Sequence, residues 1–185
     1  MLRAHLPSPW NDRFVGGFRK GAMEANVSVG IGPGSAILGS TATHDIALAK
    51  LSLGRVVSNT RAEGRWYRGN WELLGEMFGG GQFEPNAAYL VGLTGVLRYN
   101  FVTSTRLVPF FDLGAGVSAT DIGRPDLGST FEFNTQIGGG LRWFFNAHAA
   151  ITAQYRLLHL SNAGTAHPNG GVNTSMFYVG VSWIF

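Results

Sequence analysis

The sequence contains no cysteine, which removes disulfide bonds and thiolate metal sites from consideration. Charged residues are also scarce, at 14% of 185 residues, which is unusual for a surface that faces water on all sides. No apolar run reaches the roughly eighteen residues that a membrane-spanning helix needs. The formal net charge of +3 is too small and too scattered to indicate a nucleic-acid partner. The composition therefore argues against a surface that faces water on all sides, against membrane-spanning helices and against a nucleic-acid partner.

The apolar residues lie instead in short segments in which apolar and polar residues alternate, the period of a β-strand. Turn-rich stretches separate eight such segments: Met23–Ile31, Ile46–Val56, Trp71–Phe78, Ala87–Phe101, Leu107–Ala119, Phe131–Phe145, Ala149–Ser161 and Ser175–Phe185. An even number of strands closes an antiparallel sheet without open edges. We therefore predict an all-β fold, a single eight-stranded antiparallel transmembrane β-barrel over residues 21–185. A poorly ordered N-terminal extension over residues 1–20 is expected to precede it.

The two faces of the predicted strands differ consistently along the chain. Odd positions carry mainly Leu, Val, Ile and Trp, which suit contact with lipid, whereas even positions carry charges of both signs, including Glu24, Lys50, Glu72, Glu76, Arg98, Asp112, Arg142 and Arg156. The interior of an eight-stranded barrel has room only for side chains, so these charges predict a packed polar lumen rather than a channel. A soluble barrel would reverse the faces, but the aromatic residues near the segment ends favour the membrane version.

The last segment, Ser175–Phe185, ends on an aromatic residue and resembles the closing strand of bacterial outer-membrane barrels. That resemblance implies an outer-membrane location and recognition by the outer-membrane barrel assembly machinery. The first twenty residues lack the apolar core of about seven to fifteen residues that an export signal needs. We therefore expect the export signal to be absent from this chain.

The segment from Ile151 onward places His159 and Ser161 on the apolar, odd face. Two polar groups directed at lipid are expected only near the membrane interface or where a function uses them. Residues two apart on one strand have Cα atoms about 6.5 to 7 Å apart, so an imidazole could activate the serine hydroxyl. Asn162 and the backbone N–H of Gly164 could stabilise an oxyanion. The long stretch that follows, residues 162–173, predicts that this end lies at the outer leaflet, together with the long stretches 79–85 and 120–129.

The run His159, Ser161, Asn162, Ala163, Gly164, Pro168, Asn169 and Gly171, followed by the terminal strand, resembles the PagL-type lipid A 3-O-deacylases. The resemblance implies an eight-stranded outer-membrane barrel that hydrolyses the ester-linked acyl chain at the 3-position of lipid A. It implies that His159 is the general base and Ser161 the nucleophile, and it places Asn162 and Gly164 near the oxyanion. The motif covers roughly the final thirty residues of the chain.

The sequence departs from the family at one position. The family's catalytic acid is a glutamate fourteen positions after the histidine, and here that position holds Asn173. Asparagine can accept a hydrogen bond from the imidazole and fix its tautomer, but it brings no charge to stabilise an imidazolium. Slower catalysis is expected. Asp121 and Asp126, in a long loop on the same predicted side, are alternative acids, and Asn169 is expected to satisfy backbone groups in a turn.

The sequence thus predicts a carboxylic ester hydrolase that acts on lipid A or a related lipopolysaccharide glycolipid, with Ser161, His159 and Asn173 as its catalytic residues. No cofactor is required by that chemistry, and no metal site is predicted, since His5, His44 and His148 lack partners at ligand spacing. The main alternative is a catalytically inactive outer-membrane barrel with a structural, adhesive or lipid-binding role. A soluble, ligand-carrying barrel is a third interpretation, and a homodimer is left open.

Overall fold

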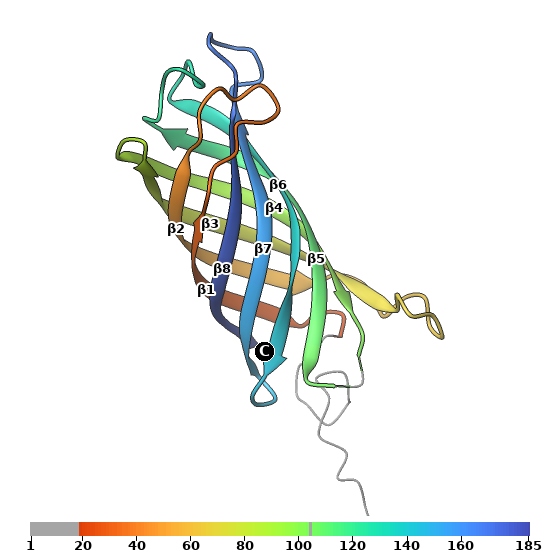
Figure 1. Ribbon diagram of the computed structural model, residues 1–185. Coiled ribbons are helices and arrows are strands. Elements are labelled where there is room, and N and C mark those ends of the chain that lie inside the picture. The colour runs from red at the N-terminus through yellow and green to blue at the C-terminus, as the bar shows by residue number, and fades with distance from the viewer. Residues whose placement is uncertain (1–18, 104) are drawn as a thin grey trace, which may run out of the picture.

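The computed structural model describes residues 19–103 and 105–185, which form a closed barrel of eight β-strands (Figure 1). The strands are β1 (Met23–Gly32), β2 (Asp45–Val56), β3 (Gly69–Glu84), β4 (Ala88–Phe101), β5 (Leu107–Thr120), β6 (Phe131–Phe144), β7 (Ala149–Ser161) and β8 (Val172–Ile184). In the described part of the chain, no helix is long and apolar enough to cross a membrane. The predicted extension over residues 1–20 lies outside the described residues, except for Arg19 and Lys20.

Every strand pairs antiparallel with the next strand along the chain, and β8 pairs with β1 to close the sheet. Closure leaves no open strand edge, so the backbone hydrogen bonds are satisfied within the barrel, as a lipid environment requires. The predicted all-β, eight-stranded antiparallel barrel is therefore confirmed. Apart from the end of β3, every strand bound either agrees with the sequence prediction or differs from it by one to three residues.

The strand β3 differs more, because Gly79–Glu84 continue the strand that the sequence predicts to end at Phe78. The glycines at positions 79–81 look like a turn, but they pair with β2 on one side and β4 on the other. A Cβ atom at Gly80 would collide with the backbone of Ala47, so glycine is used here for close strand packing.

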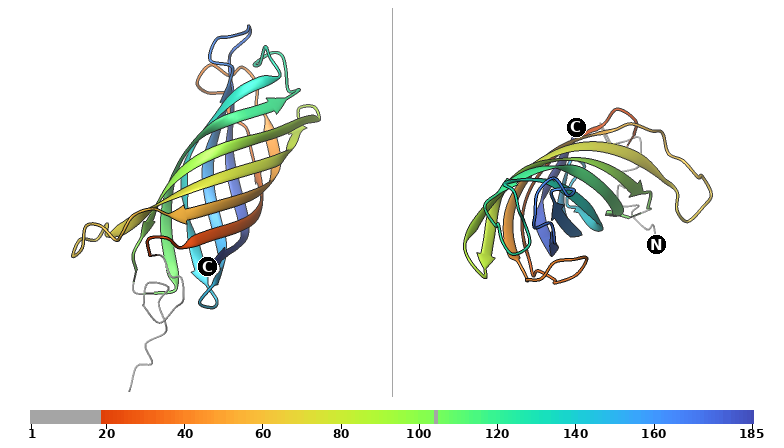
Figure 2. Two further views of the ribbon diagram at one scale, coloured as in Figure 1. Left: turned by 180° about the vertical axis from the view of Figure 1, so that it is seen from behind. Right: turned by 90° about the horizontal axis from the view of Figure 1, so that it is seen from above.

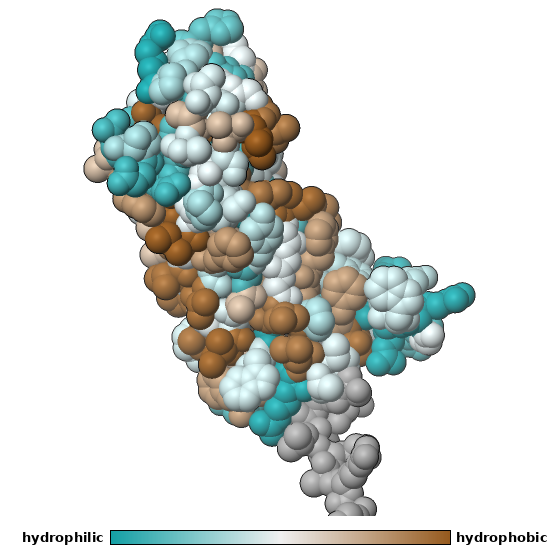
Figure 3. Space-filling view, in the orientation of Figure 1, coloured by the Kyte–Doolittle hydropathy of each residue, from teal (hydrophilic) through white to brown (hydrophobic). Residues whose placement is uncertain are grey.

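Side chains alternate between the outside and the lumen along each strand, as the sequence predicts. The outward positions are apolar and exposed, for example Val29 at 64%, Leu53 at 63% and Val179 at 60%. The space-filling view shows apolar residues gathered along the middle of the barrel, with hydrophilic residues at both ends (Figure 3). This distribution fits a barrel whose middle band contacts the hydrocarbon of the membrane and whose two ends contact water.

The lumen is filled by paired charges. Arg98 donates to Asp112 through Nε at 2.7 Å and through Nη2 at 3.0 Å, and Arg156 Nη2 donates to Asp112 Oδ2 at 2.7 Å. Arg142 pairs with Glu24 and is completely buried. Burial of charges is tolerated where each has an opposite partner and hydrogen bonds. The charges of the even face therefore form one part of the core, which also holds two clusters of buried apolar side chains, one around Leu160 and Met176 and one around Val108 and Phe144.

The connections at the two ends of the barrel differ in length. One end carries residues 33–44, 85–87, 121–130 and 162–171, and the other carries residues 57–68, 102–106 and 145–148. Outer-membrane barrels have long loops outside and short turns facing the periplasm, so the first end corresponds to the outer leaflet. The connection at residues 57–68 is an exception, because it is long and lies at the short-turn end, where it projects from the side of the barrel (Figure 2).

Candidate active site

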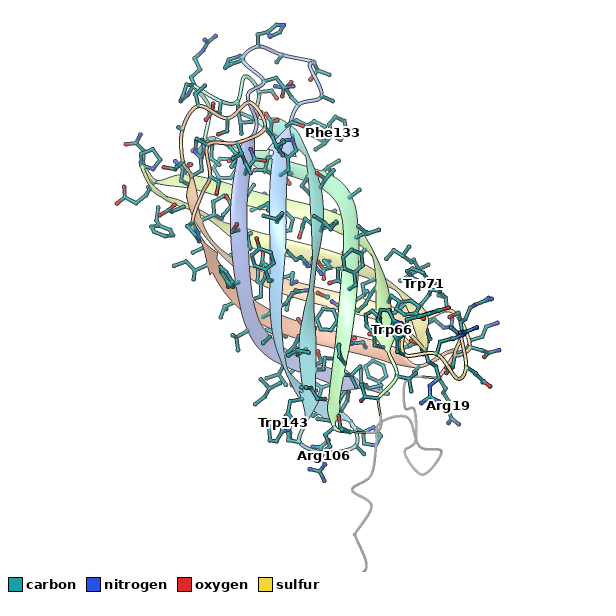
Figure 4. The ribbon with its side chains drawn as sticks, turned by 45° about the vertical axis from the view of Figure 1, so that its right-hand side comes forward. Arg19, Trp66, Trp71, Arg106, Phe133 and Trp143 are labelled. Carbon is teal, nitrogen blue, oxygen red and sulfur yellow. The ribbon has the colours of Figure 1, made fainter. Side chains whose placement is uncertain are left out.

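The last residues of β7 place His159 and Ser161 on the outside of the barrel. The inward neighbours Leu158 and Leu160 are fully buried, whereas His159 and Ser161 are half-buried. Ser161 lies opposite Phe133 of β6, which Figure 4 labels near the outer end of the barrel. The two polar side chains therefore share the lipid face, close to the loops.

Asn173 lies beside His159 on the neighbouring strand, because the β7–β8 register pairs the two residues directly. The Oδ1 atom of Asn173 is 2.7 Å from Nδ1 of His159. The amide Nδ2 of Asn173 donates to the carbonyl of Ile37 at 2.7 Å, and the carbonyl of Asn173 accepts from the backbone N–H of Ser35. The segment before β2 therefore completes this site, a contribution that the sequence analysis did not anticipate.

These contacts determine which nitrogen of His159 carries the proton. Because Nδ2 of Asn173 donates to Ile37, the Oδ1 atom is the one that faces the imidazole, and it can only accept. The Nδ1 atom of His159 must then be the donor, which leaves the lone pair of Nε2 available as a base. In the described part of the chain, no hydrogen bond joins His159 to Ser161. Such contacts commonly tighten only when substrate binds.

Asn162 is buried and organises the loop that follows β7. Its Oδ1 accepts from the backbone N–H of Gly164 at 3.0 Å, and its backbone N–H donates to Oδ1 of Asn169 at 3.0 Å. The structural role expected for Asn169 is therefore confirmed. To stabilise an oxyanion, the N–H of Gly164 would have to release Oδ1 of Asn162 and bind the substrate instead. The assignment of Asn162 and Gly164 to an oxyanion site therefore stays a prediction.

Asp126 ties the outer loops together, and it does not contact His159. Its carboxylate accepts from Nε2 of buried His44 at 2.9 Å and from the backbone N–H groups of Thr41 and Ala42 at 2.7 and 2.9 Å. Its carbonyl accepts from Gly170. Although burial alone would raise the pKa of Asp126, these hydrogen bonds hold that pKa well below its usual value.

The prediction of Asp126 as an alternative acid is therefore wrong, because its carboxylate is fully engaged in this loop cluster. Asp121 accepts from the backbone N–H of Tyr89 at 2.7 Å. Asn173 already occupies the Nδ1 side of His159. Sequence reasoning treated His44 as a residue without partners and missed its pairing with Asp126, because the two residues are far apart in the chain.

A groove of about 410 Å³ lies beside His159 and Asn173 on the outer surface. Leu113, Ile137 and Leu157 line it on three neighbouring strands, and Ile37 and Leu38 form its wall on the loop side. Leu38 is 77% exposed, so the apolar side chain at this wall of the groove is not covered by other residues of the protein. The groove thus offers an apolar surface, of the kind an aliphatic chain would contact, next to the imidazole.

Residues 19–103 and 105–185 contain no group of three or more His, Asp and Glu side chains able to hold a metal ion. The site instead combines a hydroxyl, an imidazole with a fixed tautomer and an apolar groove on the lipid face of a barrel. Together, the fold and these side chains define an outer-membrane β-barrel with His159 and Ser161 on its outward face.

The chain belongs to the lipid A 3-O-deacylase (PagL) family, whose family model matches residues 49–182. The lipid A deacylase PagL of Pseudomonas aeruginosa is 32% identical over 114 residues, which make up 60% of this chain and 62% of that protein. The alignment therefore spans less than two thirds of the length of this relative.

Solved structures agree on the fold. The crystal structure of the outer membrane enzyme PagL superposes with a TM-score of 0.61 at 22% identity, covering 84% of this chain and 97% of that chain. Neisserial surface protein A superposes with a TM-score of 0.62 at 14% identity, covering 90% and 100%. The chain is thus an outer-membrane protein with the small-barrel fold of both.

Proposed function

We propose that this protein is a serine esterase of the outer membrane that removes an ester-linked acyl chain from lipid A or a related glycolipid. The 3-O position is the one that family membership implies. The observation that carries the proposal is the chain of hydrogen bonds from Ile37 through Asn173 to His159. It places the proton of the neutral imidazole on Nδ1, so that Nε2 can act as the base on the face that also holds Ser161.

In the proposed reaction, Nε2 of His159 takes the proton from Oγ of Ser161, and Oγ attacks the ester carbonyl. The carbonyl oxygen becomes an oxyanion, which the N–H of Gly164 and the amide of Asn162 would stabilise. Collapse breaks the ester C–O bond, and His159 returns the proton to the departing sugar hydroxyl. Water, activated by the same imidazole, then attacks the acyl-enzyme and releases a fatty acid. No cofactor enters this scheme.

The groove beside His159 supports a long acyl chain as the group that is removed. Its lining of Leu113, Ile137 and Leu157 follows the outer face toward the membrane centre, the direction in which an acyl chain of an outer-leaflet lipid extends. A water-soluble ester would gain little from an apolar groove that faces hydrocarbon. The proposed substrate is therefore a lipid held in the leaflet, with its ester at the level of the loops.

The test compares, by mass spectrometry, lipid A from outer membranes that contain the protein with lipid A from outer membranes that contain its Ser161→Ala variant. Loss of one acyl chain is expected with the wild type and not with the variant. Ser175→Ala is a matched control, because Ser175 is also outward and half-buried, and its hydroxyl shares a hydrogen bond with the exposed hydroxyl of Tyr155. It should act as the wild type does.

Unchanged lipid A in every sample, with barrels shown to be folded, would instead support the inactive barrel with a structural, adhesive or lipid-binding role. That alternative draws on Asn173, which brings no charge to the imidazole. The proposal includes assembly by the barrel assembly machinery, and it leaves a homodimer open.

A further inference from the structure

Residues 57–68, which connect β2 to β3, form a lateral arm with a defined backbone. The N–H of Arg61 donates to the carbonyl of Gly69 at 2.7 Å, and the N–H of Val102 donates to the carbonyl of Arg68 at 2.7 Å. The hydroxyl of Tyr99 on β4 donates to the carbonyl of Tyr67 at 2.7 Å. These bonds attach the lateral arm to the barrel, so it presents its side chains in a fixed arrangement.

The lateral arm points away from the side of the barrel, level with the other short-turn connections, in Figure 1 and in the left view of Figure 2. Trp66 near its tip is 87% exposed, the largest exposure among the large apolar residues of the described chain. Figure 4 labels Trp66, Trp71 and Arg19 on this side of the barrel. The ring of Trp66 makes an edge-to-face contact with the neighbouring Tyr67, at 5.5 Å between ring centroids, and is otherwise largely exposed. An exposed indole held beside a membrane barrel is placed as interfacial tryptophans are.

Basic residues gather at the same end. They are Arg19, Lys20, Arg55, Arg61, Arg65, Arg68 and Arg106. Among the described residues, Glu63 is the one exposed carboxylate side chain at this end. Arg61 and Arg65 are exposed and belong to the lateral arm itself. At the outer end of the barrel the balance of charge is reversed. There the acidic residues Asp45, Glu84 and Asp121 outnumber the basic residue Arg124.

We propose that the lateral arm binds the headgroups of anionic phospholipids in the periplasmic leaflet, with Arg61 and Arg65 on the phosphates and Trp66 at the interface between headgroups and acyl chains. Guanidinium groups bind phosphate oxygens through paired hydrogen bonds, and basic side chains near an anionic leaflet favour its lipids. This inference is independent of the proposed hydrolysis, because the lateral arm lies at the opposite end of the barrel from His159.

The position of the lateral arm favours a lipid over a periplasmic macromolecule. Its attachment residue Tyr99 belongs to an aromatic cluster in which Tyr99 stacks edge-to-face with Trp71 at 4.8 Å and with Phe101 at 5.1 Å between ring centroids. Aromatic girdles of this kind mark the membrane boundary on outer-membrane barrels. An arm that projects sideways from the girdle follows the headgroup layer, whereas a surface for a periplasmic partner would face away from the membrane.

The test uses tryptophan fluorescence of the full-length protein in vesicles that mix phosphatidylcholine with phosphatidylglycerol at equal mole fractions, with either one lipid or the other brominated. The difference between the wild type and Trp66→Phe isolates the emission of Trp66. Brominated phosphatidylglycerol should quench that emission at least about twofold more than brominated phosphatidylcholine at low salt. The preference should disappear at about 1 M salt, where the Debye length is about 3 Å.

The double variant Arg61→Gln/Arg65→Gln should also lose the preference, while Arg124→Gln, an exposed arginine at the other end, should keep it. If the double variant does not fold, the salt dependence of the wild type decides the question. Equal quenching by both lipids would overturn the proposal, because charge would not select the lipid. Absence of quenching by either lipid would also overturn it, since the lateral arm would then extend into water toward a periplasmic partner.

Discussion

Replacement of Asn173 by aspartate changes one atom and adds the charge that the family's glutamate supplies. Oδ1 stays in place, 2.7 Å from Nδ1 of His159. The second carboxylate oxygen replaces the amide nitrogen 2.7 Å from the carbonyl oxygen of Ile37, so two acceptors face each other. The substitution therefore strengthens the contact to His159 and removes the contact to the loop.

The two effects have opposite signs. Loss of the hydrogen bond to the Ile37 carbonyl costs about 0.5 to 1.5 kcal/mol of unfolding free energy, because Asn173 is buried but Ile37 is half exposed. That loss lowers the unfolding temperature by roughly 1 to 6 °C. In the transition state His159 is an imidazolium, and a charge-assisted hydrogen bond exceeds a neutral one by about 1 to 1.5 kcal/mol. The same variant should therefore show a kcat about tenfold higher.

The assay follows release of fatty acid from lipid A in detergent micelles, with thermal unfolding measured on the same sample. Asn173→Ala, which loses both contacts, should be slower than the wild type. Ala36→Asp adds an equal charge to the exposed part of the neighbouring loop and should leave kcat unchanged. A folded Asn173→Asp protein with an unchanged or lower kcat would refute the assignment of His159 as the base that becomes charged.

Three further predictions concern the loops, the lumen and the groove. Hydrogen bonds hold the pKa of Asp126 low, so the carboxylate stabilises the loops fully above about pH 4, and this stabilisation is lost as the pH falls further. Limited proteolysis should detect the loosened loops at low pH, and in the Asp126→Asn variant it should detect them at neutral pH. Arg98→Leu removes one of the buried cations that pair with Asp112, so urea unfolding should show a free energy of unfolding lower by about 3 to 5 kcal/mol. Arg124 is exposed, so Arg124→Leu should lower the free energy of unfolding by less than about 1 kcal/mol. Ile137→Trp fills the groove, so acyl-chain analysis should find hydrolysis of long chains reduced more than that of short ones.

The fold could be predicted from sequence because each strand repeats one local rule. Alternation with period two indicates which side chains face lipid, and the even number of strands indicates closure. The rule failed at Gly79–Glu84, where glycines resemble a turn. Their strand conformation depends on the backbones of β2 and β4 lying close on both sides, which no local pattern records.

The outward position of His159 and Ser161 could be inferred from the sequence, because parity along one strand fixes which face a residue occupies. Asn173 was found through the resemblance to the family, whose glutamate occupies that position, and its odd parity agreed with a place beside His159.

The atoms that complete the site are known only from the folded barrel. The carbonyl of Ile37 fixes the amide of Asn173, and the pairing of His44 with Asp126 joins the loops above it. These residues come from segments that lie far apart in the chain and meet because the barrel closes. The side of the barrel toward which residues 57–68 project is likewise set by the tilt of β2 and β3 in the closed sheet. Contacts of this kind depend on strand shear and loop packing, which act between segments and leave no periodic signature in the sequence.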